Sequence, residues 1–100
     1  MELLLALVDL LDDVGRLAAA RPPGEAETFV QEKLRLLIEL NQGEIIRLDR
    51  WDPALQRAVR VEPASAEAPE DTILRSAASG LKVGGRLVRK QEVVLARSGA

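Results

Sequence analysis

The sequence predicts an α+β fold: an N-terminal helical hairpin followed by a small antiparallel β-domain. Two observations support this prediction. Up to residue 40, apolar residues recur at intervals of three and four, which is the period of an amphipathic helix. After Gly43 the pattern changes to short β-branched or leucine-rich runs separated by turn residues, which is typical of strands. We therefore expect a helical region at residues 1–43 and a β-domain at residues 44–100.

The first helix is expected over residues 2–20, because its apolar side chains form two adjacent stripes. One stripe contains Leu4, Leu7, Leu11 and Val14, and the other contains Leu3, Leu10 and Leu17. Pro22 and Pro23 end this helix, since proline lacks the amide hydrogen and clashes with the preceding turn. An apolar sector this wide needs more than one packing neighbour.

Three acidic residues, Asp9, Asp12 and Asp13, fall on the remaining face of this helix. They lack the regular oxygen-ligand spacing of a calcium loop, so we interpret them as a solvated face rather than a metal cluster. No other group of residues resembles a metal site, and we expect no bound metal.

The second helix is expected from about Glu25 to Leu40, with acidic residues in its first turn and a mainly apolar inner face. Gly43 follows Asn41 and Gln42, and we expect it to adopt the left-handed conformation that closes a helix. The inward residues are Phe29, Val30, Leu34, Leu37, Ile38 and Leu40.

Six short strands are expected at residues 45–48, 58–61, 72–74, 81–83, 86–88 and 92–95. Gly84-Gly85 predicts a two-residue hairpin turn, because both positions can take positive φ. Asp52-Pro53 predicts an N-cap and a single helical turn. The segment 63–71 is rich in alanine, proline, serine and acids, and it predicts a solvated loop.

The composition excludes most kinds of active site. The chain has 100 residues, a net charge of -2, and no cysteine or histidine, so a disulfide, a zinc finger, a thiolate nucleophile and an imidazole base are all absent. Only 2% of residues are aromatic, which leaves no stacking platform for single-stranded nucleic acid. We therefore expect a binding protein without a cofactor rather than an enzyme.

No apolar stretch approaches the roughly 20 residues that cross a bilayer, so no membrane partner is expected. The lack of cysteine and of a secretory leader indicates a cytoplasmic protein. Residues 72–100 contain six basic residues and one acid, Glu92, giving this end a net charge of +5. This basic end suits an acidic partner surface or a phosphate backbone, and the alternative is a solvated strand face.

The leucines of the hairpin predict a homodimer. Two helices cannot cover both apolar stripes, and burying one aliphatic side chain is worth about 2 kcal/mol. The pairing of two hairpins into a four-helix bundle would cover them. In the alternative, the β half folds back onto the hairpin within one chain. The expected interface residues are Leu4, Leu7, Leu11, Val14, Phe29, Leu34 and Leu37.

Two strings of residues, DPALQRAV at 52–59 and GLKVGGRLVRKQEVVLA at 80–96, resemble the β-domain of the GrpE family. That family carries an Asp-Pro-x-x-His-x-Ala-Val element, then a loop, then Gly-Tyr-x-x-x-Gly-Arg-x-x-Arg-Pro-Ala-x-Val. The string ELLLALVDLLDDVGRL at 2–17 is similar to the stretch that begins the family's dimer bundle. The β-domain residues that match in order are Asp52, Pro53, Ala58, Val59, Gly80, Gly85, Arg86, Arg89 and Val93.

The chain departs from the family pattern at several positions. Gln56 replaces a histidine, Leu81 a tyrosine, Asp71 a frequent glycine, and Lys90-Gln91 a Pro-Ala pair. The family's long paired helix, which precedes the bundle, has no counterpart in this sequence. We therefore expect a short form, and the roles of that helix in temperature response and in contact with the chaperone's substrate-binding part are not carried over.

The resemblance implies a stress-response co-chaperone for protein folding, which binds the nucleotide-binding domain of an Hsp70 (DnaK-type) chaperone and accelerates ADP release. Arg86 and Leu95 are the contact candidates that the resemblance carries over, followed by Arg89 and Lys82. The alternative is a dimeric scaffold or nucleic-acid-binding adaptor that kept the fold and lost exchange activity. The altered motif and the basic strands motivate that alternative, although basic strands without aromatic residues are a weak nucleic-acid signal.

Overall fold

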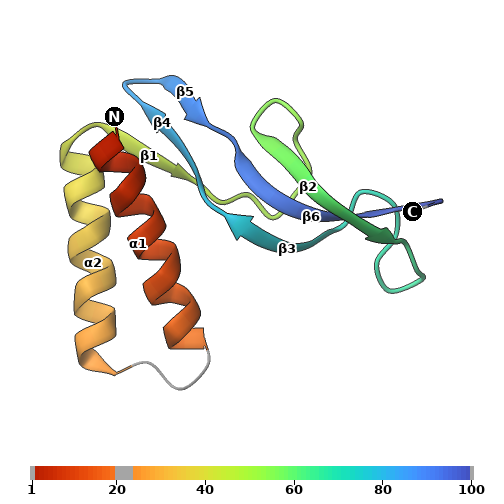
Figure 1. The fold of residues 1–100 in the computed structure, drawn as a ribbon, viewed down its shortest axis with the longest axis horizontal. Helices are drawn as coiled ribbons and strands as arrows, with labels where there is room; N and C mark the ends of the chain where they lie inside the picture. Colours follow the sequence, from red (N-terminus) through yellow and green to blue (C-terminus); the bar gives the residue numbers. More distant parts are fainter. Residues whose placement is uncertain (1, 20–23, 100) are drawn as a thin grey trace.

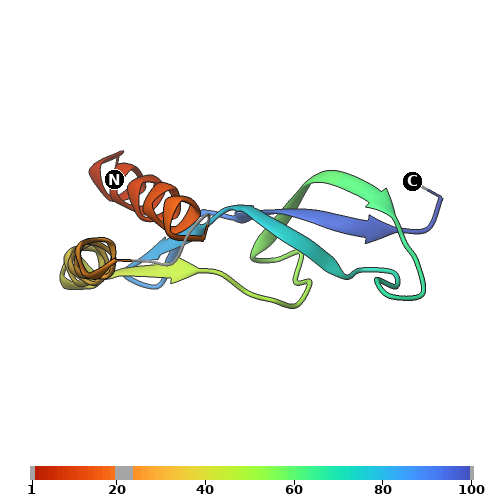
Figure 2. The same ribbon diagram turned by 90° about the horizontal axis from the view of Figure 1, so that it is seen from below.

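Two helices at one end and two small sheets at the other make a flat, elongated molecule of 42 × 35 × 17 Å (Figure 1, Figure 2). The computed structural model describes residues 2–19 and 24–99, so the predicted stop at Pro22 and Pro23 lies outside the described residues. The helices are α1 (Glu2–Ala19) and α2 (Glu25–Leu40). The strands are β1 (Gly43–Ile46), β2 (Gln56–Pro63), β3 (Ile73–Ala78), β4 (Gly80–Val83), β5 (Arg86–Arg89) and β6 (Gln91–Arg97). The α+β prediction and all six predicted strands are confirmed.

The second helix begins and ends as predicted, at Glu25 and Leu40. At its start, the backbone N–H of Gly24 donates to the carboxylate of Glu27, which supplies an acceptor to an otherwise unpaired donor. At its end, the residue with positive φ is Gln42, at 63°, and not Gly43, so the expectation for Gly43 is wrong. Gly43 is needed for a different reason. A Cβ there would lie 2.6 Å from Ile38 Cγ2, so a larger residue would push β1 away from α2.

The six strands form two three-stranded sheets. The first sheet has the order β1-β4-β5, and the second has the order β2-β6-β3. The prediction of a purely antiparallel unit is wrong at one pair, because β2 runs parallel to β6. The reason lies in the path of the chain. Strand β1 is antiparallel to β4, so it runs in the same direction as β5 and β6. After β1 the chain crosses to the other side of β6 without reversing its direction, and β2 therefore runs parallel to β6 (Figure 1).

Two predicted turns have the expected chemistry. Gly84 and Gly85 have φ values of 57° and 81°, which places both in the left-handed region and closes the β4–β5 hairpin. The backbone N–H of Ala54 donates to Asp52 Oδ1 at 2.9 Å, and the N–H of Gln56 donates to the Asp52 carbonyl at 2.8 Å. The Asp52 side chain therefore caps a single turn, as the sequence predicts. Residues 64–72 form the predicted loop.

The main core lies where the hairpin meets the first sheet. Its buried members are Val8, Leu11, Leu34, Ile38 and Leu81. The first sheet therefore covers one face of the hairpin within a single chain, while the outer faces of both helices keep exposed leucines. A second apolar interior surrounds β6, where Val93 through Ala96 are all buried. Within the described residues, no helix combines the length and apolarity needed to cross a bilayer.

Candidate functional site

The β4–β5 hairpin presents the first candidate surface. Its turn is held against the helices, because the backbone N–H of Gly84 donates to the Gln42 carbonyl at 3.0 Å, just after α2 ends. In Figure 1 the hairpin therefore lies beside the end of α2 and the beginning of α1. A turn anchored in this way presents its side chains at a fixed position relative to the helices.

Arg86 is the exposed cation of this hairpin. It lies opposite Val83 across the strands, while Lys82 lies opposite Leu87, which is 41% exposed. Among the described residues, neither Arg86 nor Lys82 has an ion-pair partner within 4 Å. We call Lys82, Arg86 and Leu87 the hairpin surface. Successive residues of a strand point to opposite faces, so Lys82 and Leu87 lie on one face of the hairpin and Arg86 lies on the other. The exposed, unpaired Arg86 suits an acidic group on a protein partner.

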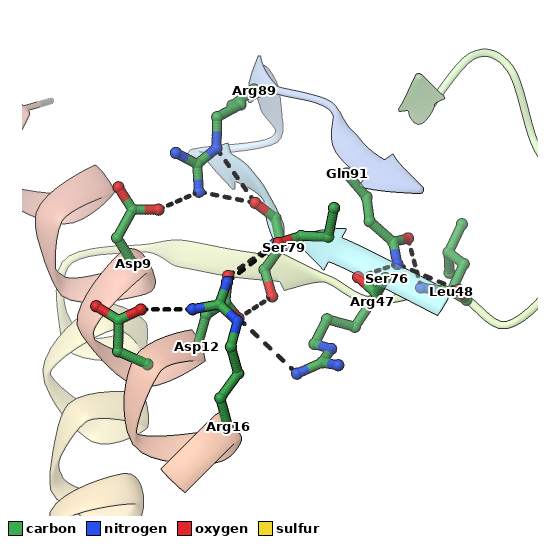
Figure 3. Close-up of polar contacts among 11 residues, drawn as sticks. Asp9, Asp12, Arg16, Arg47, Leu48, Ser76, Ser79, Arg89 and Gln91 are labelled. Atoms are coloured by element: carbon green, nitrogen blue, oxygen red, sulfur yellow. Dashed lines mark hydrogen bonds and ion pairs between the residues drawn. The ribbon is translucent and has the colours of Figure 1, made fainter. Parts of the chain in front are cut away.

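Arg89 has a different role from the one expected by resemblance. Its Nη2 donates to Asp9 Oδ1 at 2.8 Å and to the Ser79 carbonyl at 2.8 Å, and its Nε donates to the same carbonyl at 3.2 Å (Figure 3). The side chain is only 27% exposed. Arg89 therefore ties β5 to α1 inside the molecule, and its guanidinium is already engaged.

Leu95 cannot be a contact residue in this structure, because it is 0% exposed at the centre of the second sheet. Its expected partner-binding role is corrected to core packing. Val93, which matches the family motif two positions earlier, is also 0% exposed. A buried apolar strand and a solvent-facing contact strand have similar compositions, so sequence alone did not separate these positions.

The contacts that Asp9 and Asp12 of α1 make with the β-domain are what the sequence interpretation missed. Asp12 is 7% exposed and accepts hydrogen bonds from the Ser79 backbone N–H at 2.8 Å and the Ser79 Oγ at 2.6 Å (Figure 3). Asp9 pairs with Arg89. Asp13, which pairs with Arg16 near the surface, fits the predicted solvated face, and the Asp9 side chain is 56% exposed although it binds Arg89. Asp9 and Asp12 mark the side of α1 that meets the β-domain, and no group of potential metal ligands occurs among residues 2–19 and 24–99.

Two of the departures from the family motif, Gln56 and Gln91, meet in the interior of the β-domain. Gln56 and Gln91 are each 1% exposed, and Gln56 Nε2 donates to Gln91 Oε1 at 2.9 Å. The backbone of Leu48 is bound by both amides: its N–H donates to Gln91 Oε1 at 2.9 Å, and its carbonyl accepts from Gln56 Nε2 at 3.3 Å. The two glutamines therefore fix the segment that crosses between the sheets.

The outer faces of the helices form the second candidate surface. Of the predicted interface residues, Phe29 and Leu37 are 59% and 47% exposed and remain available to a partner. Leu11 and Leu34 belong to the core of the chain itself, which corrects their assignment. Leu4, Leu7 and Val14 pack partly against that core. The exposed residues, which we call the helical apolar face, are Leu3, Leu10, Leu17, Phe29, Val30, Leu36, Leu37 and Leu40.

Most cations of the second sheet are engaged by acids. Arg75 Nη2 donates to Glu62 Oε2 at 2.6 Å, and Arg60 lies 3.4 Å from the same oxygen. The hydrogen bond from Arg75 lowers the pKa of Glu62 below its ordinary value of 4.5. Arg57 pairs with Glu92 in the same way. Little of the positive charge on these strands is therefore free for a phosphate backbone.

Comparison with known proteins finds one relative that covers both halves of the chain. Protein GrpE of Fructilactobacillus sanfranciscensis is 26% identical over an alignment 100 residues long, which covers 91% of this chain and 56% of the relative. The chain is similar to GrpE. It spans about half the length of that relative, and no protein-family model matches it. The match supports a GrpE-like assignment that covers both the helical hairpin and the β-domain.

Proposed function

We propose that this chain is a GrpE-like co-chaperone, which binds the nucleotide-binding domain of an Hsp70-type chaperone through its β-domain and accelerates the release of ADP. The observation that carries the proposal is the similarity to GrpE over 91% of the chain, on a helical hairpin joined to a small β-domain. The unpaired Arg86 on an anchored hairpin supports it.

The mechanism requires no covalent chemistry. A partner that binds the open form of the nucleotide-binding cleft more tightly than the closed form shifts the chaperone towards the open form and weakens its hold on ADP. Linkage is reciprocal, so ADP weakens the binding of the co-chaperone by the same factor. Arg86 donates charge-assisted hydrogen bonds to a chaperone carboxylate in this proposal. The chain acts in the cytoplasm, where DnaK-type chaperones work, and it is not an enzyme.

The proposal includes a homodimer formed through the helical apolar face. Leu3, Leu10 and Leu17 are 72%, 47% and 62% exposed, and they recur every seven residues along α1. Such a repeat aligns side chains along one line of a helix, as in a bundle seam. A second hairpin would cover this line together with the exposed residues of α2.

The exchange assay tests the proposal directly. An Hsp70-type chaperone is loaded with a fluorescent ADP analogue, and the analogue's release is followed after addition of this chain at micromolar concentration. We expect faster release of the analogue and an affinity for ADP that is weakened by about 5- to 150-fold, the usual range of coupling between two sites. We also expect ADP to weaken the binding of this chain to the chaperone. An unchanged release rate with saturating chain present would refute the exchange function.

The alternative function, a nucleic-acid-binding adaptor, can be distinguished from the exchange function by a binding assay. Binding to a DNA or RNA duplex that falls steeply with salt, without chaperone binding, would favour that alternative. The paired arginines of the second sheet predict weak retention on nucleic acid at physiological salt, because carboxylates already neutralise them.

A further inference from the structure

The two sheets are joined at two short connections that lie side by side. One residue, Ser79, separates β3 from β4, and one residue, Lys90, separates β5 from β6. The strands continue across this joint as one long antiparallel pair, with Ala78 opposite Glu92 on one side and Leu81 opposite Arg89 on the other. The joint is therefore the place where the two sheets can change their relative angle.

The backbones approach very closely at the joint. A Cβ on Gly80 would lie 2.5 Å from the Gln91 N and 2.7 Å from the Arg89 O, so only glycine fits there. Such an approach interrupts the regular ladder of interstrand hydrogen bonds, and buried backbone groups at the interruption need other partners.

Side chains supply those partners at Ser79, which is 1% exposed. Its N–H and its hydroxyl both donate to the Asp12 carboxylate, and its carbonyl accepts from Arg89 (Figure 3). Asp12 belongs to α1, so a helix of the hairpin holds the joint from outside both sheets. Arg47 Nη1 lies 3.8 Å from Asp12 Oδ1 and adds a longer-range positive charge.

A buried carboxylate is costly unless hydrogen bonds and charges compensate it. Hydrophobic contacts alone could pack α1 against the first sheet, but they would not fix an angle, because apolar contact is not directional. Two short hydrogen bonds to one residue are directional and act at the point about which the sheets would turn.

We propose that Asp12 is a positioning residue that locks this joint and so fixes the second sheet at one angle relative to the helical hairpin. The consequence for partner binding rests on the proposed function: a chaperone that contacts the β-domain of a dimer meets it in one orientation. The lock itself is a property of the chain alone and can be measured without a chaperone.

Pulsed electron-electron spin resonance tests the lock. Spin labels are attached at Ala6→Cys on α1 and Val59→Cys on β2, both at exposed positions. The sequence contains no other cysteine, so labelling is confined to these two sites. Labelled chain is diluted with unlabelled chain, so that only distances within one chain are recorded. The parent is expected to give one narrow distance distribution.

Asp12→Ala is expected to broaden the distribution or to add a second distance. Ser79→Ala, which keeps the backbone N–H but loses the hydroxyl, is expected to broaden it less. Asp13→Ala is the matched control, because it removes the same charge from the neighbouring, exposed position, and it should leave the distribution unchanged.

The lock is refuted if Asp12→Ala, with the parent's circular dichroism, keeps the parent's distribution, or if Asp13→Ala broadens it equally. Should Asp12→Ala fail to fold, Asp12→Asn and Ser79→Ala decide the matter by the same measurement, since each removes only part of the bonding. A parent chain that fails the exchange assay but shows the narrow distance would refute the proposed function and leave the lock intact.

Discussion

Gln56 and Gln91 bind each other in the interior of the β-domain, with 2.9 Å between Gln56 Nε2 and Gln91 Oε1. By resemblance, these are the positions of a histidine and an alanine in the GrpE motif. Two residues that depart from the motif are therefore hydrogen-bond partners in this structure. Each side-chain amide supplies a hydrogen bond to the polar group that the other places in the core.

Alanine at either glutamine should destabilise the fold by about 1–3 kcal/mol, because partners such as the Leu48 backbone lose their hydrogen bonds in a buried site. The double variant should cost less than the sum of the single variants, with a coupling of about 0.5–3 kcal/mol. Urea unfolding of the four chains measures this coupling. Gln31→Ala, on the half-buried side of α2, serves as the control with a near-neutral effect. Strictly additive costs would contradict the compensation.

Arg86→Ala should weaken chaperone binding without changing the melting temperature, because Arg86 is exposed and has no ion-pair partner among the described residues. One hydrogen bond to a charged group is worth about 1.5–3 kcal/mol, which corresponds to roughly a 10- to 150-fold loss of affinity. Titration calorimetry and thermal melting measure the two effects. Arg50→Ala is the control, because Arg50 is also exposed, lies away from the hairpin surface and has no ion-pair partner in the part of the chain that the structure describes. An equal loss for both variants would assign the effect to net charge.

Leu10→Glu should convert the proposed dimer into a monomer, because it places a charge in the middle of the helical apolar face. Val59→Glu is the matched control: Val59 is 45% exposed and Leu10 47%, but Val59 lies on the second sheet. Sedimentation equilibrium at micromolar concentration gives the mass of each chain. A monomeric parent, or a dimer of Leu10→Glu with the parent's stability, would exclude this interface.

Two glycine substitutions should change the stability of the fold in opposite directions. Gly80→Ala should destabilise the fold strongly, because the new Cβ would lie within 3 Å of backbone atoms of β5 and β6 that cannot easily move. Gly15→Ala should stabilise it by about 0.5–1 kcal/mol, since alanine favours the helix and its Cβ would meet only Gln31 Nε2 at an ordinary 3.8 Å. Chemical denaturation of both variants measures the difference. A neutral Gly80→Ala would show that the strands separate easily at the joint.

The Glu62 ion pairs should make a pH-dependent contribution to stability. Because Arg75 lowers the pKa of folded Glu62 below 4.5, this contribution is complete above pH 4.5 and is lost as the pH falls through the folded pKa. The difference in melting temperature between the parent and Glu62→Gln should therefore be larger at pH 7 than at pH 3. Glu67→Gln, in the exposed loop, provides the control. A difference that does not change between pH 7 and pH 3 would contradict the assignment.

Local pattern was sufficient for the elements and their turns. The bounds of α2 and the Gly84-Gly85 hairpin follow from helical periodicity, capping and positive φ, which depend on neighbouring residues only. The parallel pairing of β2 with β6 could not be predicted, because it depends on which side of a long hairpin the chain crosses to. Nothing within the strand sequence encodes that choice.

The candidate site was predicted only in part, for a related reason. The exposure of Arg86 could be predicted because it matches a motif and lies at a turn, and turns are exposed, while its contact with a partner stays a prediction. The burial of Asp12 was not predicted, because its partner, Ser79, is 67 residues away in the sequence. When no partner is known, an aspartate on a helix is interpreted as facing solvent. Leu95 was misassigned because burial on both faces of a central strand depends on neighbours that come together only in the fold.

The single-residue connections at Ser79 and Lys90 set limits on how the length of this chain can change. One added residue at either connection would turn every following side chain of the strand to the opposite face, exposing Leu81 or Val93 to water. The loop at residues 64–72 is not a strand, so its length does not determine which face its side chains occupy. Affinity tags, fluorescent peptides or natural insertions can be accommodated in that loop, whereas the two connections should tolerate neither a gain nor a loss of one residue.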